Sequence, residues 1–204
     1  NNTSVAAHGH YAPDRGARGE SYGARLSGGF DVNPRLAASG EAGFAQGRSR
    51  REAYVRIGLR MRFGERGTLQ AEADSKGRLR ANFSDSGGTG NGAWQTSGDI
   101  SRDGGTVSLN AGGALQTNRA DLGVQQTAGW NTRGGGITDA RTTLRAAFAL
   151  AFADGALALG RPVSEAFVIA RPHRSLAGKR IYLDPTEHGE TARSDALGAA
   201  LDGP

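Results

Sequence analysis

Three groups of residues in this 204-residue chain have types and spacings that could support chemistry. His8 and His10 could bind a metal ion, but a site needs further ligands and no third one lies nearby. Residues 87–92 have the glycine density of a phosphate-binding loop, yet no Lys-Ser/Thr pair follows them. Glu72 and Asp74 are paired carboxylates at alternate positions of a polar strand face, where exposure is the usual state.

None of these groups combines a nucleophile, a base and an orienting partner. We therefore expect no enzyme activity, no catalytic residue, no metal and no cofactor. The chain has no cysteines, which excludes disulfides and thiolate metal sites, and it contains 33 glycines with only 37% hydrophobic residues. A water-soluble core built from this composition would be thin.

The charge balance is basic, with 25 Lys+Arg against 20 Asp+Glu. A soluble Gly/Arg-rich nucleic-acid-binding domain is one reading of that excess. The arginines are nevertheless dispersed, without a dense basic run or the interleaved aromatic residues on which bases stack. We therefore expect no nucleic-acid partner, and we keep this soluble domain as an alternative.

Residues 54–63 alternate strictly between apolar and polar side chains, which predicts an extended strand. Arg56, Arg60 and Arg62 occupy one face, and each arginine would cost about 2–4 kcal/mol at the middle of a membrane. If the opposite face meets lipid, the arginines must face a wet lumen. The alternative is a strand of a soluble β-sandwich with its arginines in solvent. The apolar face consists of Val55, Ile57, Leu59, Met61 and Phe63.

Other segments repeat this pattern, and none has the length of a transmembrane helix. Residues 69–73 and 79–83 read as a hairpin, a polar loop is expected over residues 84–92, and short and long connections are expected to alternate. Asp154-Gly155 predicts a tight hairpin turn. The most apolar stretch also alternates, and we assign Leu144, Phe148, Leu150 and Phe152 to the lipid-facing set with the five residues of 54–63. The predicted class is all-β, with antiparallel transmembrane barrel strands.

The composition changes after residue 171, where glycines become rare and prolines cluster. We therefore expect two parts, residues 1–171 and residues 172–204, with a short strand at residues 179–183 in a small β-sandwich-like domain. Because the chain lacks an initiator Met and ends abruptly at Pro204, we expect it to be a fragment, with targeting signals outside it.

One segment carries a specific resemblance: Phe152-Ala-Asp-Gly-Ala-Leu-Ala-Leu-Gly-Arg-Pro-Val-Ser-Glu-Ala-Phe-Val-Ile-Ala-Arg171. It resembles the last hairpin of the translocation barrel in fimbrial outer-membrane ushers of the chaperone–usher pathway, which has the form "ADG…LSRPISDSFAIV". Residues 176–183 and 191–198 are similar to the opening of the first C-terminal periplasmic domain in that family.

The resemblance implies a non-enzymatic secretion pore in the outer membrane of a Gram-negative bacterium. Family members form a barrel of about two dozen strands. Residues 1–171 would belong to that barrel, and residues 172–204 would begin the periplasmic domain. The implied partners are periplasmic chaperone–pilus subunit complexes, pilus subunits and outer-membrane lipid, with assembly by donor-strand exchange. Another outer-membrane β-barrel, or an autotransporter or adhesin β-domain, remains an alternative.

Overall fold

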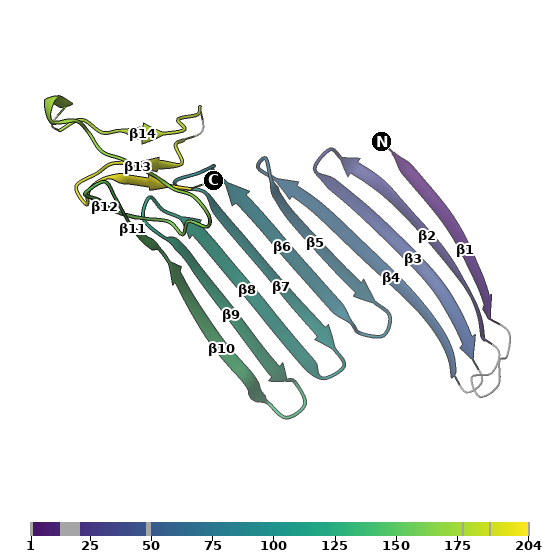
Figure 1. Ribbon diagram of the computed structural model, residues 1–204. Coiled ribbons are helices and arrows are strands. Elements are labelled where there is room, and N and C mark those ends of the chain that lie inside the picture. Colours follow the sequence, from purple (N-terminus) through teal and green to yellow (C-terminus); the bar gives the residue numbers. More distant parts are fainter. Residues whose placement is uncertain (1, 13–20, 48–49, 177, 188, 204) are drawn as a thin grey trace. The chain divides into compact units, whose positions relative to one another are not determined.

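The computed structural model describes residues 2–12, 21–47, 50–176, 178–187 and 189–203. It confirms the all-β class, because ten strands pair in sequence order into one antiparallel sheet (Figure 1). No helix in the described part of the chain has the length and apolar character needed to cross a membrane. The sheet strands are β1 (Thr3–Ala12), β2 (Ser21–Asn33), β3 (Leu36–Gly47), β4 (Arg50–Phe63), β5 (Gly67–Asp74), β6 (Leu79–Gly87), β7 (Trp94–Asp103), β8 (Thr106–Gln116), β9 (Asp121–Asn131) and β10 (Gly136–Ala147).

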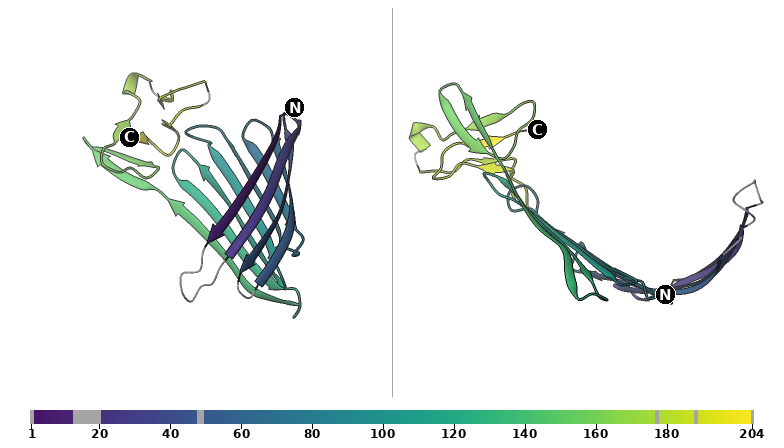
Figure 2. Two further views of the ribbon diagram at one scale, coloured as in Figure 1. Left: turned by 90° about the vertical axis from the view of Figure 1, so that its right-hand side faces the viewer. Right: turned by 90° about the horizontal axis from the view of Figure 1, so that it is seen from below.

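The chain divides into two compact units, and the first contains residues 1–84, 98–110 and 128–140. Every described strand of this unit belongs to the sheet, so the unit is a single layer, which Figure 2 shows edge-on for β1 to β5. The predicted hairpin of residues 69–73 and 79–83 is confirmed, with Leu69 opposite Phe83 and Ala73 opposite Leu79. Strict alternation produces such strands because successive side chains point to opposite faces.

The β5–β6 turn is built by one carboxylate. Asp74 accepts hydrogen bonds from the backbone N–H of Lys76 and of Arg78, each at 3.0 Å. The Arg78 guanidinium also donates to Asp74, at 2.6 Å. A glycine suits this turn because Gly77 has a φ of 77°, in the left-handed region. The carboxylate is therefore used for local structure.

The expectation of a loop over residues 84–92 is wrong at its start, because β6 continues to Gly87. A Cβ at Gly87 would lie 2.8 Å from the Trp94 indole nitrogen, so a glycine is needed where that ring covers the strand. The expected alternation of short and long connections is also not found among the described ones. The long 88–93 connection and the two-residue 34–35 connection belong to the same end of the sheet, because successive connections of an antiparallel meander alternate ends.

The second unit contains residues 85–97, 111–127 and 141–204. The predicted Asp154-Gly155 turn is confirmed, with φ values of 50° and 70°, and it joins β11 to β12. The expected strand at residues 179–183 is shorter than predicted, because only Tyr182–Leu183 is extended. The strands of this unit beyond the sheet are β11 (Ala149–Ala153), β12 (Ala156–Gly160), β13 (Val168–Ala170), β14 (Tyr182–Leu183), β15 (Ala192–Arg193) and β16 (Ala200–Asp202).

The core of the second unit is small. Ala151 and Ala158, on one face of the β11–β12 hairpin, pack against Ala199 and Leu201. Leu201 is 2% exposed and is the largest fully buried side chain of the described residues. β13 pairs with β16, so residues on either side of position 171 share one two-stranded sheet, and β14 pairs with β15 in a second one. A single leucine set among alanines gives this core little apolar burial.

Leu201 fits against the hairpin because Gly160 has no side chain. A Cβ on Gly160 would lie 2.6 Å from the Cβ of Leu201, which cannot swing away. We expect Gly160→Ala to destabilise the protein by about 1–3 kcal/mol through overpacking. Urea unfolding followed by tryptophan fluorescence measures this loss. Gly40→Ala is the matched control, since a Cβ at Gly40 meets nothing within 4 Å. Equal midpoints for the two variants would contradict this packing.

Candidate functional site

Strands β1 to β6 sort their side chains into one apolar and one polar face. Directly opposed residues of an antiparallel pair point to the same side. Leu59 lies opposite Ala38 of β3 and Ala71 of β5, and the registers extend this apolar face to both sides. The polar side chains on this face are Thr3, Gln46 and Arg51, near the strand ends, and its apolar side chains are Val5, Ala7, Tyr11, Tyr22, Ala24, Leu26, Phe30, Leu36, Ala38, Ala42, Phe44, Ala53, Val55, Ile57, Leu59, Met61, Phe63, Leu69, Ala71, Ala73, Leu79, Ala81 and Phe83.

The large side chains of the apolar face are open to their surroundings. Val5 is 74% exposed and Ile57 is 63% exposed, and Leu59 is 56% exposed. In β4, exposure alternates along the central residues, with Val55 and Ile57 exposed and Arg56 half-buried. Soluble proteins rarely expose apolar patches that span several strands. This face therefore requires an apolar medium or a partner.

Aromatic residues of the apolar face lie toward the strand ends, a feature that the sequence analysis missed. Tyr11, Tyr22 and Phe44 lie toward one end. There the Tyr22 and Phe44 rings pack edge to face, with their ring centres 6.2 Å apart. Phe30, Phe63 and Phe83 lie toward the other end. Tyr22 and Phe30 are separated by about 26 Å along β2, at roughly 3.3 Å per residue. Two aromatic girdles around an aliphatic band about 25 Å tall are typical of transmembrane β-sheets.

The three arginines of β4 lie on the polar face but in different surroundings. Arg56 stands opposite Glu41 of β3 and Asp74 of β5. Its guanidinium lies 5.8 Å from the centre of the Tyr54 ring, and the Tyr54 hydroxyl donates to Glu41 at 2.7 Å.

Arg60 and Arg62, by contrast, face neutral neighbours. Gln70 lies opposite Arg60 and Thr68 lies opposite Arg62, and both arginines are exposed. Arg56 thus belongs to a charge-compensated row across the strands. The other two arginines do not.

The second part of the predicted lipid-facing set is exposed as well. Leu144, Phe148, Leu150 and Phe152 are all exposed, although Phe148 interrupts the strand between β10 and β11. Leu157, opposite Phe152, extends the same face of the hairpin. The hairpin is therefore apolar and exposed on one face, while its alanine face packs on the small core.

The other sequence candidates do not assemble a reactive centre among the described residues. His8 and His10 lie on the polar face of β1, opposite Arg25 and Gly23, and no group of three or more metal-ligating side chains occurs in the described chain. Gly88, Gly90 and Gly92 adopt positive φ values in the β6–β7 connection, and strand β7 follows them.

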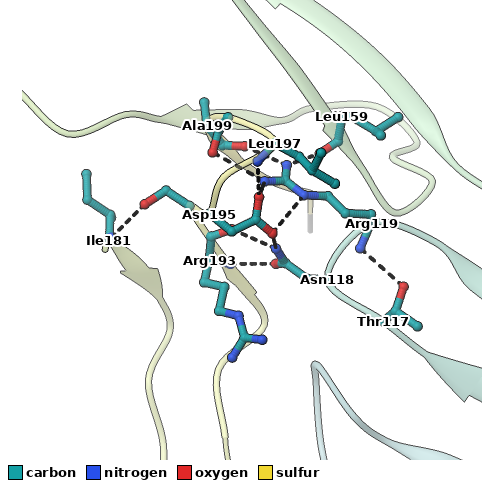
Figure 3. Close-up of polar contacts among 11 residues, drawn as sticks. Thr117, Asn118, Arg119, Leu159, Ile181, Arg193, Asp195, Leu197 and Ala199 are labelled. Carbon is teal, nitrogen blue, oxygen red and sulfur yellow. Dashed lines mark hydrogen bonds and ion pairs between the residues drawn. The ribbon is translucent and has the colours of Figure 1, made fainter. Parts of the chain in front are cut away.

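The most elaborate polar cluster lies elsewhere, in the β8–β9 connection of the second unit. Thr117 organises this turn: its hydroxyl donates to the Ala120 carbonyl at 2.8 Å and accepts from the Ala120 N–H at 3.0 Å. The turn presents Asn118 and Arg119 to the end of the chain (Figure 3).

Arg119 joins three segments of the second unit. Its guanidinium forms an ion pair with the Asp195 carboxylate through Nη2, and Nε donates to the other carboxylate oxygen at 3.3 Å. It also donates to the Ala199 carbonyl at 2.8 Å, to the Gly198 carbonyl at 3.2 Å, and to the Leu159 carbonyl at the end of β12. The Arg119 side chain is 12% exposed. Such a forked, multiply bonded contact depends on the planar geometry of arginine.

Asn118 is buried and its amide binds the main chain of β15. The amide oxygen accepts from the Arg193 N–H at 2.7 Å, and the amide nitrogen donates to the Arg193 carbonyl at 2.8 Å. A second donor bond reaches Asp195 at 2.8 Å. The side chain thereby imitates the pairing of a neighbouring strand.

Further contacts within the second unit involve the β6–β7 connection and Arg161. The Asn91 N–H, in the β6–β7 connection, donates to the Glu190 carbonyl at 2.7 Å. Arg161, just after β12, pairs with Asp202 at 3.6 Å and donates to the Gln116 side chain at 3.3 Å. The length of the β6–β7 connection is thus used to contact the end of the chain.

Sequence reasoning missed Asn118 and Arg119 as contact residues. The available signals were a Thr-initiated polar turn and the position of Asp195 within the segment that resembles a periplasmic domain.

Comparison with known proteins finds no matching family model, no matching curated protein and no matching solved structure.

The Asp195 carboxylate should make the protein sensitive to acid. The Arg119 guanidinium lowers the pKa of Asp195 below its usual value, and hydrogen bonds from Leu197 N–H and the Asn118 amide act in the same direction, against partial burial. A carboxylate with a lowered folded-state pKa contributes stability above its unfolded pKa of about 3.9, and the contribution is lost as pH falls through the folded value.

We therefore expect the stability difference between the unmutated protein and Asp195→Asn to be constant above about pH 5 and to shrink below about pH 4. Urea midpoints measured across this range test it. A difference that persists unchanged at the lowest pH would show that the charge of Asp195 is not what stabilises the fold.

Proposed function

We propose that residues 1–171 form part of the wall of an outer-membrane pore of the usher type, and that residues 172–204 begin its periplasmic domain. The pore would translocate pilus subunits delivered by a periplasmic chaperone and would have no enzymatic activity. The observation that carries this proposal is the exposed apolar face of β1 to β6, with aromatic residues toward both ends and arginines on the opposite face.

The apolar face supports a lipid environment on energetic grounds. Fully burying a Val, Leu, Ile or Phe side chain is worth about 1.5–3 kcal/mol, so a face with a dozen large exposed apolar residues favours transfer into hydrocarbon. The unbroken antiparallel pairing suits this environment, because a membrane leaves no water for unpaired backbone groups. We accordingly assign Val55, Ile57, Leu59, Met61 and Phe63, with Leu144, Phe148, Leu150 and Phe152, to the lipid side.

The polar face suits the wall of a wet passage. Arg60 and Arg62 are exposed beside neutral side chains, and the Arg56 row is charge-compensated. A lumen of this kind offers a folded protein few apolar contacts, so the cargo would not adhere strongly. Cargo assembly by donor-strand exchange is a strand addition and needs no nucleotide.

The resemblance of residues 152–171 favours an usher over another outer-membrane barrel. In the structure this segment holds the tight turn at Asp154-Gly155, strand β12, and strand β13, which pairs with the end of the chain. A hairpin that leads directly into a small β unit is the order expected at the end of an usher barrel. The consecutive antiparallel meander also differs from the stacked coils of a β-solenoid adhesin.

A charge on the apolar face should prevent insertion. We expect Leu59→Arg in the full protein to reduce insertion into lipid vesicles strongly, since an arginine near the membrane midplane costs about 2–4 kcal/mol. Insertion is measured by heat-modifiable gel mobility and by protection from added protease.

Asn82→Arg is the matched control because Asn82 lies on the polar face of β6, opposite the neutral Gln70. It should insert normally. Equal insertion of the two variants would refute the assignment of the faces, and with it the membrane pore.

The lumen assignment is tested by reversing one charge that has no structural partner opposite it. We expect Arg60→Glu to change the amount of pilus subunit assembled at the cell surface while leaving the urea midpoint unchanged, because Arg60 faces Ala37 and Gln70. Arg56 is unsuitable, since a carboxylate there would face Glu41 and Asp74. A large loss of stability, or no effect on surface assembly, would count against the lumen position of Arg60.

A further inference from the structure

The end of the chain is held by two short strand pairings, a small alanine-rich core and a set of polar contacts. We define the C-terminal segment as residues 189–203. Its only fully buried large side chain among the described residues is Leu201, and its strands β15 and β16 are two and three residues long. Regions with few buried apolar contacts open locally at low free energy. Because the strand pairings are short and the core is small, the bonds from Asn91, Asn118 and Arg119 supply a large part of what holds the segment docked.

We propose that Asn118 and Arg119 form a latch that docks the C-terminal segment reversibly, so that the segment alternates between a docked and a released state. The docked state is the one in which Arg119 joins Asp195 and the Leu159 carbonyl, and Asn118 binds the main chain of Arg193. This inference rests on the geometry of the second unit and is independent of the secretion function.

Arg119 is suited to a latch because its guanidinium N–H groups donate both to the hairpin and to the C-terminal segment. They reach β12 at Leu159 and the C-terminal segment at Asp195, Gly198 and Ala199. Release would leave the guanidinium and the carboxylate free to bind water, so the open state carries no buried unpaired charge. An apolar clamp would lack this low-cost open state.

Release would uncover one specific surface. The alanine face of the β11–β12 hairpin, with Ala151 and Ala158, is covered in the docked state by Ala199 and Leu201. Gly160 adds to this flat, small-residue face, since Leu201 lies directly against it. The accessibility of Ala151 is therefore a direct readout of the latch, because it is 7% exposed when docked.

The experiment uses the full chain, which has no cysteines of its own, with Ala151→Cys as a reporter. The rate of labelling by a water-soluble maleimide is compared with that of Glu165→Cys, an exposed position. We expect the reporter to label slowly, and we expect Arg119→Met or Asn118→Ala to speed its labelling by about tenfold or more, equivalent to about 1.4 kcal/mol. Arg133→Met, an exposed arginine of the β9–β10 connection, should leave the rate unchanged.

Far-UV circular dichroism of each variant separates release from unfolding. Faster labelling with an unchanged β-sheet spectrum supports the latch. Three results would overturn it: a reporter that labels as fast as Glu165→Cys before any latch mutation, no acceleration in either latch variant, or acceleration accompanied by loss of the sheet. None of these readouts depends on membrane insertion or subunit export, so a failure here leaves the proposed function untouched.

Discussion

The two-residue repeat of an extended chain is the constraint on which the rest of this structure depends. Because successive side chains alternate sides, a one-residue slip in any pairing would carry apolar residues to the polar face. The register avoids this across β1 to β6, where Ile57 and Leu59 meet apolar residues or glycine on both neighbouring strands. The few hydrophobic residues thus form one continuous surface. Glycines in these strands lose little packing energy, because no core has to be filled.

The alternation also explains how much the sequence could predict. It predicted the β class, the 69–83 hairpin and the Asp154-Gly155 turn, since each depends on neighbours within a few residues. It did not predict the contact between Arg119 and Asp195, because nothing local in either segment specifies a partner so far along the chain. The strand extension to Gly87 was missed for the same reason, because glycine-rich sequence reads as loop unless the covering Trp94 ring is known.

The two units use their side chains in opposite ways. In the first, the main chain is paired strand to strand and the apolar groups remain outside, so the environment must complete the structure. In the second, the strands are short and the core has one large residue. Hydrogen bonds from side chains to main-chain carbonyls therefore contribute much of the stability. The proposed membrane contact and the proposed latch therefore belong to separate regions of one chain.

The Asn118 amide has a consequence beyond holding the segment in place. A strand at the border of a small sheet is a template for unwanted association, since its unpaired main-chain groups can recruit another polypeptide. By occupying both the N–H and the carbonyl of Arg193, this one side chain closes the free border of β15. A single amide thereby leaves neither main-chain group of Arg193 available on that border for pairing with another polypeptide.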